Sequence, residues 1–170
     1  MHDFSAVYDS HVWRVYGFFA YRLNARADAE DLTQQTFERA LRAWARYDAT
    51  RASVGTWLLA IARNLLVDHL RADRSARQHP LDADDDEHDG ALAAPPDRHD
   101  LGLAPDLEHA LAALGDRERE ILALRFGGDM TGPEIAELTD LSLANVQQIL
   151  SRTLRRMRAT MDAPDQASGR

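Results

Sequence analysis

The chain has 170 residues, of which 45% are hydrophobic, and a formal net charge of −8, which fits one ordinary globular domain or two small ones. Cysteine is absent, which excludes disulfides, cysteine-ligated zinc and a thiol nucleophile. No apolar run approaches the roughly 18 residues of a membrane span, and the first ten residues lack the basic and apolar parts of a secretory leader, so we expect a cytoplasmic protein.

Residues 1–74 show the periodicity of three amphipathic helices. The first is predicted over residues 3–22, with one buried face formed by Phe4, Tyr8, Val12, Val15 and Phe19. The second is predicted to begin at an Asp28 cap and to bury Ala29, Leu32, Thr36, Phe37, Leu41 and Trp44. The third is predicted from a Ser53 cap to about Arg74. No segment alternates long enough to be a strand, so this module is expected to be all-α.

Residues 75–105 carry most of the negative charge. They hold two Arg against eight Asp and Glu, together with a Pro pair and no sustained apolar period. This composition is typical of a flexible linker between two modules. At the other end of the chain, residues 162–170 are expected to form a disordered tail, with no fused regulatory domain after Met161.

The second module, residues 106–161, is also predicted to be helical. One helix is expected over 106–114, and the next is expected to begin at an Asp116 cap and to end at the Gly127–Gly128 pair.

A capping box follows these helices. Thr131 and Glu134 have its spacing, with Pro133 in the first helical turn. The short helix that they begin ends near Leu138, and after a tight turn Ser142 caps a last helix that runs to about Met161. Two helices joined in this way are typical of a helix-turn-helix.

The last helix has two chemically distinct faces. Counting 100° per residue places one set on the buried side: Val146, Leu150, Leu154, Met157 and Met161. The opposite side carries residue types that bind base edges and phosphates: Asn145, Gln147, Gln148, Ser151, Arg152, Arg155 and Arg156. A solvated charged face has the same composition, but the capped helix and the tight turn favour DNA reading. Ile149 lies at the side, where it would touch a thymine methyl or widen the core.

Four blocks of the sequence, taken in order, resemble the RNA polymerase sigma factors of the extracytoplasmic-function (ECF) type, in the sigma-70 family. The blocks are DAEDLTQQTFERALRAW, GTWLLAIARNLLVDHLR, ALAALGDREREILALRF and the helix-turn-helix. The resemblance implies an all-α protein with a region 2-like helical bundle and a region 4-like helix-turn-helix. It also implies a function: to bind core RNA polymerase, recognise the −35 and −10 promoter elements and nucleate strand opening, with no catalysis and no cofactor.

In the family, the helix that matches DAEDLTQQTF docks on the largest polymerase subunit. The resemblance therefore implies core-polymerase contacts at Asp28, Glu30, Asp31, Gln34, Gln35 and Phe37. An alternative for Glu30 and Asp31 is that these acids only interact favourably with the helix dipole.

In the family, the segment after Trp44 melts and reads the −10 element. Capturing an unpaired base requires a stacking surface and polar groups for the base edge. The matching residues are Tyr47, Asp48, Arg51, Ser53, Trp57, Arg63, Asn64 and Arg71. Because the spacing of Trp57 from Ile61 and Leu65 also suits a core residue, Arg63 and Asn64 are the stronger candidates.

In the family, the last helix reads the −35 element, which assigns that role to its polar face, and Thr131 is placed to meet a phosphate. Two positions depart from the family pattern: Asp140 stands where Gly is common in the turn, and Ile149 where a basic residue is frequent. The second leaves the promoter sequence open.

Two further partners follow from the resemblance. The acidic run Asp82–Glu87 matches a segment that threads the RNA exit path, where it would act as an RNA mimic, although a plain solvated spacer has the same composition. An anti-sigma factor that covers the polymerase- and DNA-binding faces is also implied, but no residue identifies one.

Two other functional classes are open. A helix-turn-helix regulator that binds its operator without polymerase would share the second module. In such a regulator, residues 30–38 and 46–53 would have no function. An enzyme would need a catalytic motif, and the sequence has neither a Gly-rich phosphate loop nor a recognisable nucleophile arrangement. No metal site is predicted, although His79, His88 and His99 could hold a metal loosely.

Overall fold

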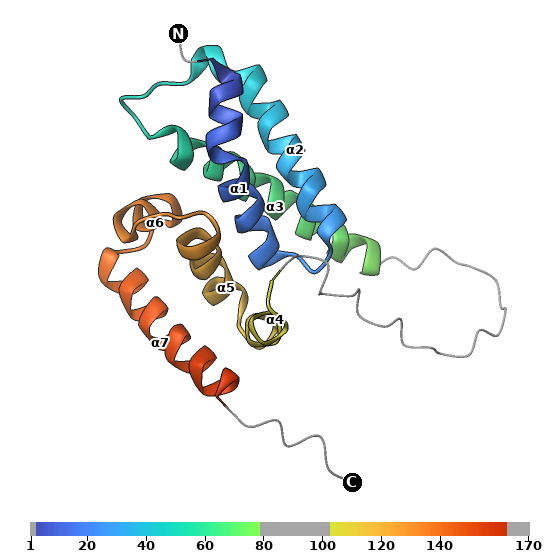
Figure 1. The fold of residues 1–170 in the computed structure, drawn as a ribbon, viewed down its shortest axis with the longest axis vertical. Helices are drawn as coiled ribbons and strands as arrows, with labels where there is room; N and C mark the ends of the chain where they lie inside the picture. Colours follow the sequence, from blue (N-terminus) through green and yellow to red (C-terminus); the bar gives the residue numbers. More distant parts are fainter. Residues whose placement is uncertain (1–2, 79–102, 163–170) are drawn as a thin grey trace, which may run out of the picture.

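The first module is a bundle of three helices, as its periodicity predicts (Figure 1). The structure is a computed structural model that describes residues 3–78 and 103–162, and this part of the chain contains helices and no strand. Helices α1 (Phe4–Arg22), α2 (Arg26–Ala43) and α3 (Val54–Gln78) pack against one another. A 3-10 turn, Trp44–Arg46, leads from α2 into the loop before α3. None of the described helices is both long and apolar enough to cross a bilayer.

The second module contains four helices and one π-helical turn. Helices α4 (Pro105–Ala112) and α5 (Asp116–Leu122) are followed by the π-helical turn, and then by α6 (Gly132–Thr139) and α7 (Leu143–Met161). The π-helical turn spans residues 123–127 and packs against α1. In Figure 1, α7 lies on the side of this module that faces away from α1 and α2. The predicted helix-turn-helix is confirmed as α6 and α7.

The predicted caps at three helix starts are confirmed. Thr131 N–H donates to Glu134 Oε2 at 2.8 Å, and Glu134 N–H donates back to Thr131 Oγ1 at 3.5 Å, which together form the capping box. Ser142 Oγ accepts from the backbone N–H of Asn145 at 3.2 Å, and Ser53 Oγ accepts from that of Thr56 at 3.2 Å. These starts are encoded locally, which is why the sequence predicts them well.

Two predicted caps are wrong. Helix α2 begins at Arg26, so Asp28 lies inside the first turn, and its carboxylate lies 4.0 Å from His69 Nε2 on α3. Helix α5 begins at Asp116 itself, after a Gly115 cap, and Glu118 Oε2 accepts from the Gly115 N–H at 3.2 Å. In both cases the aspartate is a residue type that is common at helix caps, but it lies within the first turn of the helix.

Four residues predicted to be buried are exposed, for a common reason. A helical wheel gives the direction of a side chain but not whether another element covers it. Tyr8 and Leu41 line an open groove between α1 and α2, and Leu154 and Met161 line a second groove beside Phe126. On α7, Val146 and Met157 are buried as predicted, together with Thr153, and Leu150 is partly buried against the core.

Helix α3 continues to Gln78, four residues beyond its predicted end and into the segment predicted to be a linker. Residues 79–102 of that segment lie outside the described residues, including the Asp82–Glu87 run and His79, His88 and His99, and its last residue, Pro105, begins α4. All but the first residue of the predicted tail also lies outside them.

One hydrophobic core runs through both modules. Phe18, Phe19 and Leu58 of the first module belong to the same buried cluster as Leu124 and Ile135 of the second. The two backbones approach closely at Gly17 of α1, where an added Cβ would lie 2.6 Å from Gly127 O. The two modules are therefore packed as one body, joined where α1 meets the π-helical turn.

The turn of the helix-turn-helix contains a left-handed residue, Asp140, with φ 57° and ψ 37°. This conformation favours glycine, because the Cβ of other residues crowds the following carbonyl. We expect Asp140→Gly to be neutral or to raise the free energy of unfolding by up to about 1 kcal/mol, with part of the gain offset by the greater freedom of glycine in the unfolded chain.

The matched control is Glu137→Gly, three residues earlier within α6, which should lower the free energy of unfolding by about 1 kcal/mol. Urea unfolding followed by circular dichroism measures both. Equal destabilisation by the two changes would contradict the assigned role of the turn.

Candidate protein and nucleic-acid interfaces

The outer face of α2 is a row of acids and amides held by hydrogen bonds one helical turn apart. Gln35 Nε2 donates to Asp31 Oδ2 at 2.6 Å, and Gln34 Nε2 donates to Glu38 Oε1 at 3.0 Å. Glu30 Oε1 accepts from Arg26 Nε at 2.7 Å. The face is therefore polar and ordered, and it is available to a protein partner.

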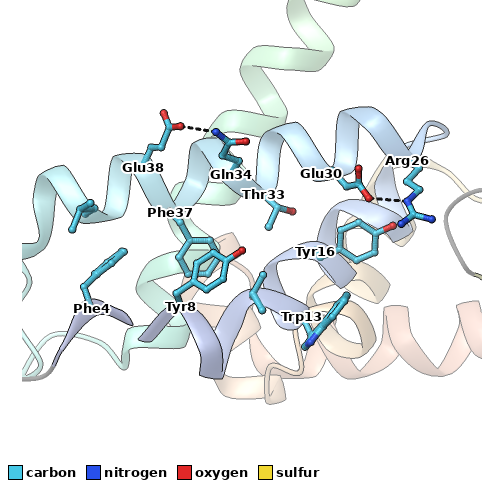
Figure 2. Close-up of a pocket in the computed structure, with 12 residues that line it drawn as sticks. Phe4, Tyr8, Trp13, Tyr16, Arg26, Glu30, Thr33, Gln34, Phe37 and Glu38 are labelled. Atoms are coloured by element: carbon cyan, nitrogen blue, oxygen red, sulfur yellow. Dashed lines mark hydrogen bonds and ion pairs between the residues drawn. The ribbon is translucent and has the colours of Figure 1, made fainter. Parts of the chain in front are cut away.

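A groove of about 750 Å³ runs beside this face, between α1 and α2 (Figure 2). Trp13 is 76% exposed and Tyr8 43% exposed, although large aromatic side chains are usually covered. Glu30, Gln34 and Glu38 form the polar rim of the groove. An apolar floor with a polar rim is the composition of a protein-docking surface.

The sequence alone did not lead to this groove. Trp13 follows Val12, which belongs to the predicted buried face, and so it does not fit the periodicity of that face. A large aromatic residue one step away from an apolar stripe is the signal that could have revealed the groove.

The other two residues predicted to contact the polymerase occupy different environments. Phe37 is only 5% exposed and packs edge-on against Tyr8, with ring centroids 4.7 Å apart, so it supports the groove from beneath. Asp28 is half-buried at the far end of α2, opposite His69.

The loop between α2 and α3 is supported by three aromatic rings. Trp44 and Tyr47 are stacked, with centroids 5.2 Å apart and planes 3° apart, and Trp57 lies against both rings. Tyr47 Oη donates to Ala52 O at 2.9 Å, which closes the loop on itself. Trp57 is half-buried, so it serves chiefly as a packed member of this cluster, the role that its spacing also indicated.

Polar groups border a cavity of about 560 Å³ beside these rings. Asp48, exposed in the loop, accepts hydrogen bonds from the Thr50 hydroxyl and backbone N–H at 2.7 and 2.9 Å, which lower the pKa of its carboxyl. Asp48 and Arg51 line the cavity from the first module, and Glu137 and Leu138 line it from α6. The predicted −10 loop thus forms a concave site with both polar and aromatic walls, while the neighbouring Ser53 caps α3.

The remaining candidates in the first module lie along α3. Arg63 is half-buried, and its Nε donates to Glu120 Oε1 of α5 at 2.7 Å. Asn64 and Arg71 are exposed on the same helix. The structure therefore leaves Asn64 and Arg71 open to a ligand but pairs Arg63 with the second module.

The predicted reading face of α7 is open to solvent. All seven of its residues are exposed: Asn145, Gln147, Gln148, Ser151, Arg152, Arg155 and Arg156. Ile149 lies at the edge of this face and is partly buried against the core. An exposed row of amide, hydroxyl and guanidinium groups on the second helix of a helix-turn-helix suits entry into a DNA major groove.

Two arginines of this face also contact an acid of α5. Arg156 Nη1 donates to Glu118 Oε1 at 2.8 Å, and Arg152 Nη2 lies 3.9 Å from the same oxygen. Sequence reasoning did not single out Glu118. Since Arg156 is tightly paired, its first role is to orient α7, and Gln148, Ser151 and Arg155 are the more available readers.

At the mouth of α6, Thr131 is exposed and its hydroxyl donates to Glu134 Oε2 at 2.7 Å. Hydrogen bonds from the Thr131 backbone and side chain, and a further one from Thr56, lower the pKa of Glu134 below its ordinary value of 4.5. No group of three or more potential metal ligands occurs among the residues that the structure describes.

Comparison with known proteins adds independent evidence. The sigma-70 region 2 family model matches residues 7–76, and the sigma-70 region 4 model matches residues 110–159. The chain is 38% identical over 164 residues to the ECF RNA polymerase sigma factor SigC of Mycobacterium tuberculosis, an alignment that covers 93% of this chain and 80% of the relative.

A second relative is longer than this chain. The chain is 31% identical over 171 residues to the ECF RNA polymerase sigma factor BldN of Streptomyces coelicolor, and the match covers 96% of this chain but only 61% of BldN. Among solved structures, the fold resembles the sigma factor RpoE in its complex with the anti-sigma factor NepR from Bartonella quintana. The TM-score is 0.71 at 18% identity, covering 96% of this chain and 99% of that one.

The lowered pKa of Glu134 predicts a pH dependence of stability. A carboxyl whose pKa is lower in the folded state stabilises the fold above its unfolded pKa, and this contribution is lost as the pH falls through the folded pKa. The stability difference between the wild type and Glu134→Gln should therefore be largest near pH 7 and should shrink below about pH 4.5.

Urea unfolding at several pH values between 7 and 3 tests this prediction, with Glu137→Gln, an exposed change of the same charge on α6, as the control. A difference for Glu134→Gln that stayed constant across the range would show that its hydrogen bonds do not favour the charged form.

Proposed function

The chain belongs to the ECF family of RNA polymerase sigma factors, and we propose that it carries out the work of that family. It binds core RNA polymerase and directs it to promoters with −35 and −10 elements, where it nucleates strand opening. The observation that carries the proposal is the combination of an exposed reading face on α7 with a separate acidic and amide face on α2 in one chain. A regulator that binds its operator without polymerase needs only the first of these faces.

Polymerase docking is assigned to the polar face of α2 together with the groove beside it. Glu30, Asp31, Gln34 and Gln35 supply hydrogen-bonding groups, while Tyr8 and Trp13 supply apolar area. Aromatic residues at the centre of a polar rim contribute most of the energy of protein interfaces. Asp28 and Phe37 act through this surface, the first at its end and the second from beneath it.

Recognition of the −10 element is assigned to the loop before α3. The cavity beside Tyr47 offers Asp48 and Arg51 to the edge of an unpaired base, with Ser53 next to it at the start of α3. Extruding a base costs a few kcal/mol. Arg63, Asn64 and Arg71 follow the strand along α3. Stacking on an aromatic side chain returns roughly 1–3 kcal/mol per base, and here Tyr47 is the better placed ring, since Trp57 is packed beneath it.

Recognition of the −35 element is assigned to α7. Asn145, Gln147, Gln148, Ser151, Arg152 and Arg155 read base edges or grip phosphates, and Arg156 holds the helix on α5. Thr131 meets a phosphate at the start of α6. The net charge of −8 keeps nonspecific affinity for DNA low, because few phosphates are neutralised.

The remaining properties follow from the family. The protein acts in the cytoplasm without catalysis of its own and without a cofactor. Relatives of this fold are held by anti-sigma factors, as the Bartonella quintana complex illustrates for its own chain. A regulator of that kind is proposed for this chain as well.

Run-off transcription tests the proposal directly. Core polymerase is combined with this protein on promoter fragments from its own genome, and protein-dependent transcripts from a discrete set are expected. No transcripts, together with tight binding of the protein alone to duplex DNA, would favour the free-standing regulator.

The docking face predicts the behaviour of Asp31→Arg. Reversing this charge should weaken holoenzyme assembly by at least about tenfold, because it removes the Gln35 partner and places a cation on an acidic face. Asp106→Arg makes the same charge change on α4, away from α2, and should assemble normally. Assembly by gel filtration or fluorescence anisotropy measures both, and normal assembly of Asp31→Arg would remove the docking assignment.

The reading face predicts the behaviour of Gln148→Ala. If Gln148 reads a base edge, Gln148→Ala should weaken holoenzyme binding to the native promoter by about 1–3 kcal/mol. On promoters altered at the base pair that Gln148 reads, the same change should have little effect. Arg158→Ala, on the same helix but beside the Leu154 groove, is the control. Holoenzyme binding to single-base promoter variants makes the measurement, and an equal loss on every sequence would demote Gln148 to a phosphate contact.

A further inference from the structure

A shielded carboxylate of α5 lies against the exposed arginines of α7. The Glu118 side chain is only 12% exposed, and carboxylates are rarely buried unless they are paired. Its Oε2 accepts from the Gly115 N–H at 3.2 Å, so the capping contact at the start of α5 fixes the carboxylate to the backbone. The same carboxylate therefore offers α7 a negative charge in a fixed place.

Two arginines one helical turn apart on α7 share this carboxylate. Arg156 Nη1 donates to Glu118 Oε1 at 2.8 Å and to Oε2 at 2.9 Å. Arg152 Nη2 lies 3.9 Å from Oε1, which is an ion-pair distance but too long for a hydrogen bond. The Arg156 and Arg152 side chains remain 52% and 62% exposed. Glu118 thus holds Arg156 firmly and Arg152 loosely, and both guanidinium groups still reach solvent.

Arg152 keeps its hydrogen-bonding capacity for a ligand. A guanidinium carries five N–H donors in a fixed fork, and Arg152 donates none of them to another group in the described part of the chain. It lies one turn after Gln148 on the exposed face of α7. An arginine fork suits guanine O6 and N7, but it suits a phosphate equally well. How the fork is held therefore decides whether Arg152 reads sequence.

The restraint from Glu118 favours a contact with one particular base. A side chain that is oriented in advance loses less conformational freedom on binding. The carboxylate also repels any phosphate that approaches it, because both groups are negative. A free Arg152 could follow a phosphate on any sequence. An Arg152 held beside Glu118 gains most from a base edge that it reaches without leaving the acid, which is discrimination by an opposing charge.

The charges on this side of α7 favour the same role. Arg152, Arg155 and Arg156 are all exposed there, and Glu118 offsets part of their positive charge. Each further phosphate that a protein neutralises steepens the plot of log K against log salt concentration by about 0.9. Without the Glu118 charge, α7 should therefore bind any duplex more tightly and depend more strongly on salt.

We propose that Glu118 is a positioning residue that sets the sequence preference of the −35 reader by restraining Arg152, with Arg156 as the anchor between α7 and α5. Glu118 acts through Arg152 and does not itself contact DNA. This inference rests on the proposed sigma function and deepens it, because it names a group outside α7 that decides which base pair α7 prefers.

Glu118→Gln tests the proposal. Glutamine serves in a capping box as glutamate does, so the start of α5 is preserved while the charge is removed. The matched control is Asp106→Asn, which makes the same change of net charge at an exposed residue of α4. Holoenzyme binding is measured on a promoter fragment found by run-off transcription, on fragments with single-base changes in its −35 element, and on one with that element scrambled. Each measurement is repeated at several salt concentrations.

Glu118→Gln is expected to lower the preference for the native base at one −35 position by at least about fivefold. It should also bind the scrambled fragment about twofold more tightly and steepen the salt dependence by about 0.9. Asp106→Asn should keep the preference of the wild type. A change in affinity that is equal on every −35 sequence would overturn the proposal, because a residue that only holds α7 in place would produce that result.

Arg152→Ala shows whether Glu118 acts through this arginine. In a chain that already carries Arg152→Ala, adding Glu118→Gln should leave the −35 preference unchanged, since the two residues act as one unit. A further loss of preference in that chain would overturn the proposal. If Glu118→Gln loses its helical circular dichroism, Glu118→Leu with Arg156→Met replaces it. Apolar residues can take the place of a shielded ion pair without loss of stability, and Arg152 is again released. An unchanged preference in this variant would overturn the proposal.

The behaviour of the wild type separates this inference from the proposed function. A wild-type holoenzyme that transcribes and distinguishes −35 variants, together with an unchanged preference in Glu118→Gln, removes the role of Glu118 alone. If the wild type supports no transcription from any fragment, the proposed function fails, and with it the inference.

Discussion

The structure depends on a backbone contact between two glycines, Gly17 in the middle of α1 and Gly127 at the end of the π-helical turn. Glycine in a helix interior costs stability, and here it permits two backbones to approach more closely than any side chain would allow. The close approach joins Phe18 and Phe19 to Leu124 and Ile135 in one core. It also sets the position of α5 and α6 relative to the first module.

Carboxylates and guanidinium groups then set which surfaces are available. Glu120 pairs with Arg63 across the modules, whereas Glu118 pairs with Arg156 within the second module. The first pairing occupies Arg63, a proposed DNA contact, whereas the second holds α7, the proposed reading helix, against α5. The acids of α5 therefore have two different effects, although they are neighbours in the sequence. The α2 face and its groove lie apart from these pairs and remain open in the packed arrangement (Figure 2).

The sequence predicted the features that are encoded locally. The capping box at Thr131, the cap at Ser142 and the tight turn before it each depend on a few adjacent residues, and the structure contains all three. The exposed face of α7 follows from helical periodicity alone. The failures have a different origin, because Leu41 and Leu154 lie on apolar stripes whose cover depends on where other helices end. The groove at Trp13 and the contact at Gly17 bring together residues that are distant in sequence, and no periodicity reports such contacts.

The proposed function requires that the two surfaces assigned to promoter DNA, the loop and α3 of the first module and α7 of the second, can move apart. Because the native sequence has no cysteine, Thr56→Cys with Glu134→Cys provides a single reactive pair across the contact. Run-off transcription with core polymerase is then measured for this variant before treatment, after joining the thiols with a short reducible cross-linker, and after reduction. Each single-cysteine variant, treated in the same way, is the control. We expect activity before treatment, loss on cross-linking and recovery on reduction. A cross-linked protein that still initiated transcription from a two-element promoter would contradict this requirement.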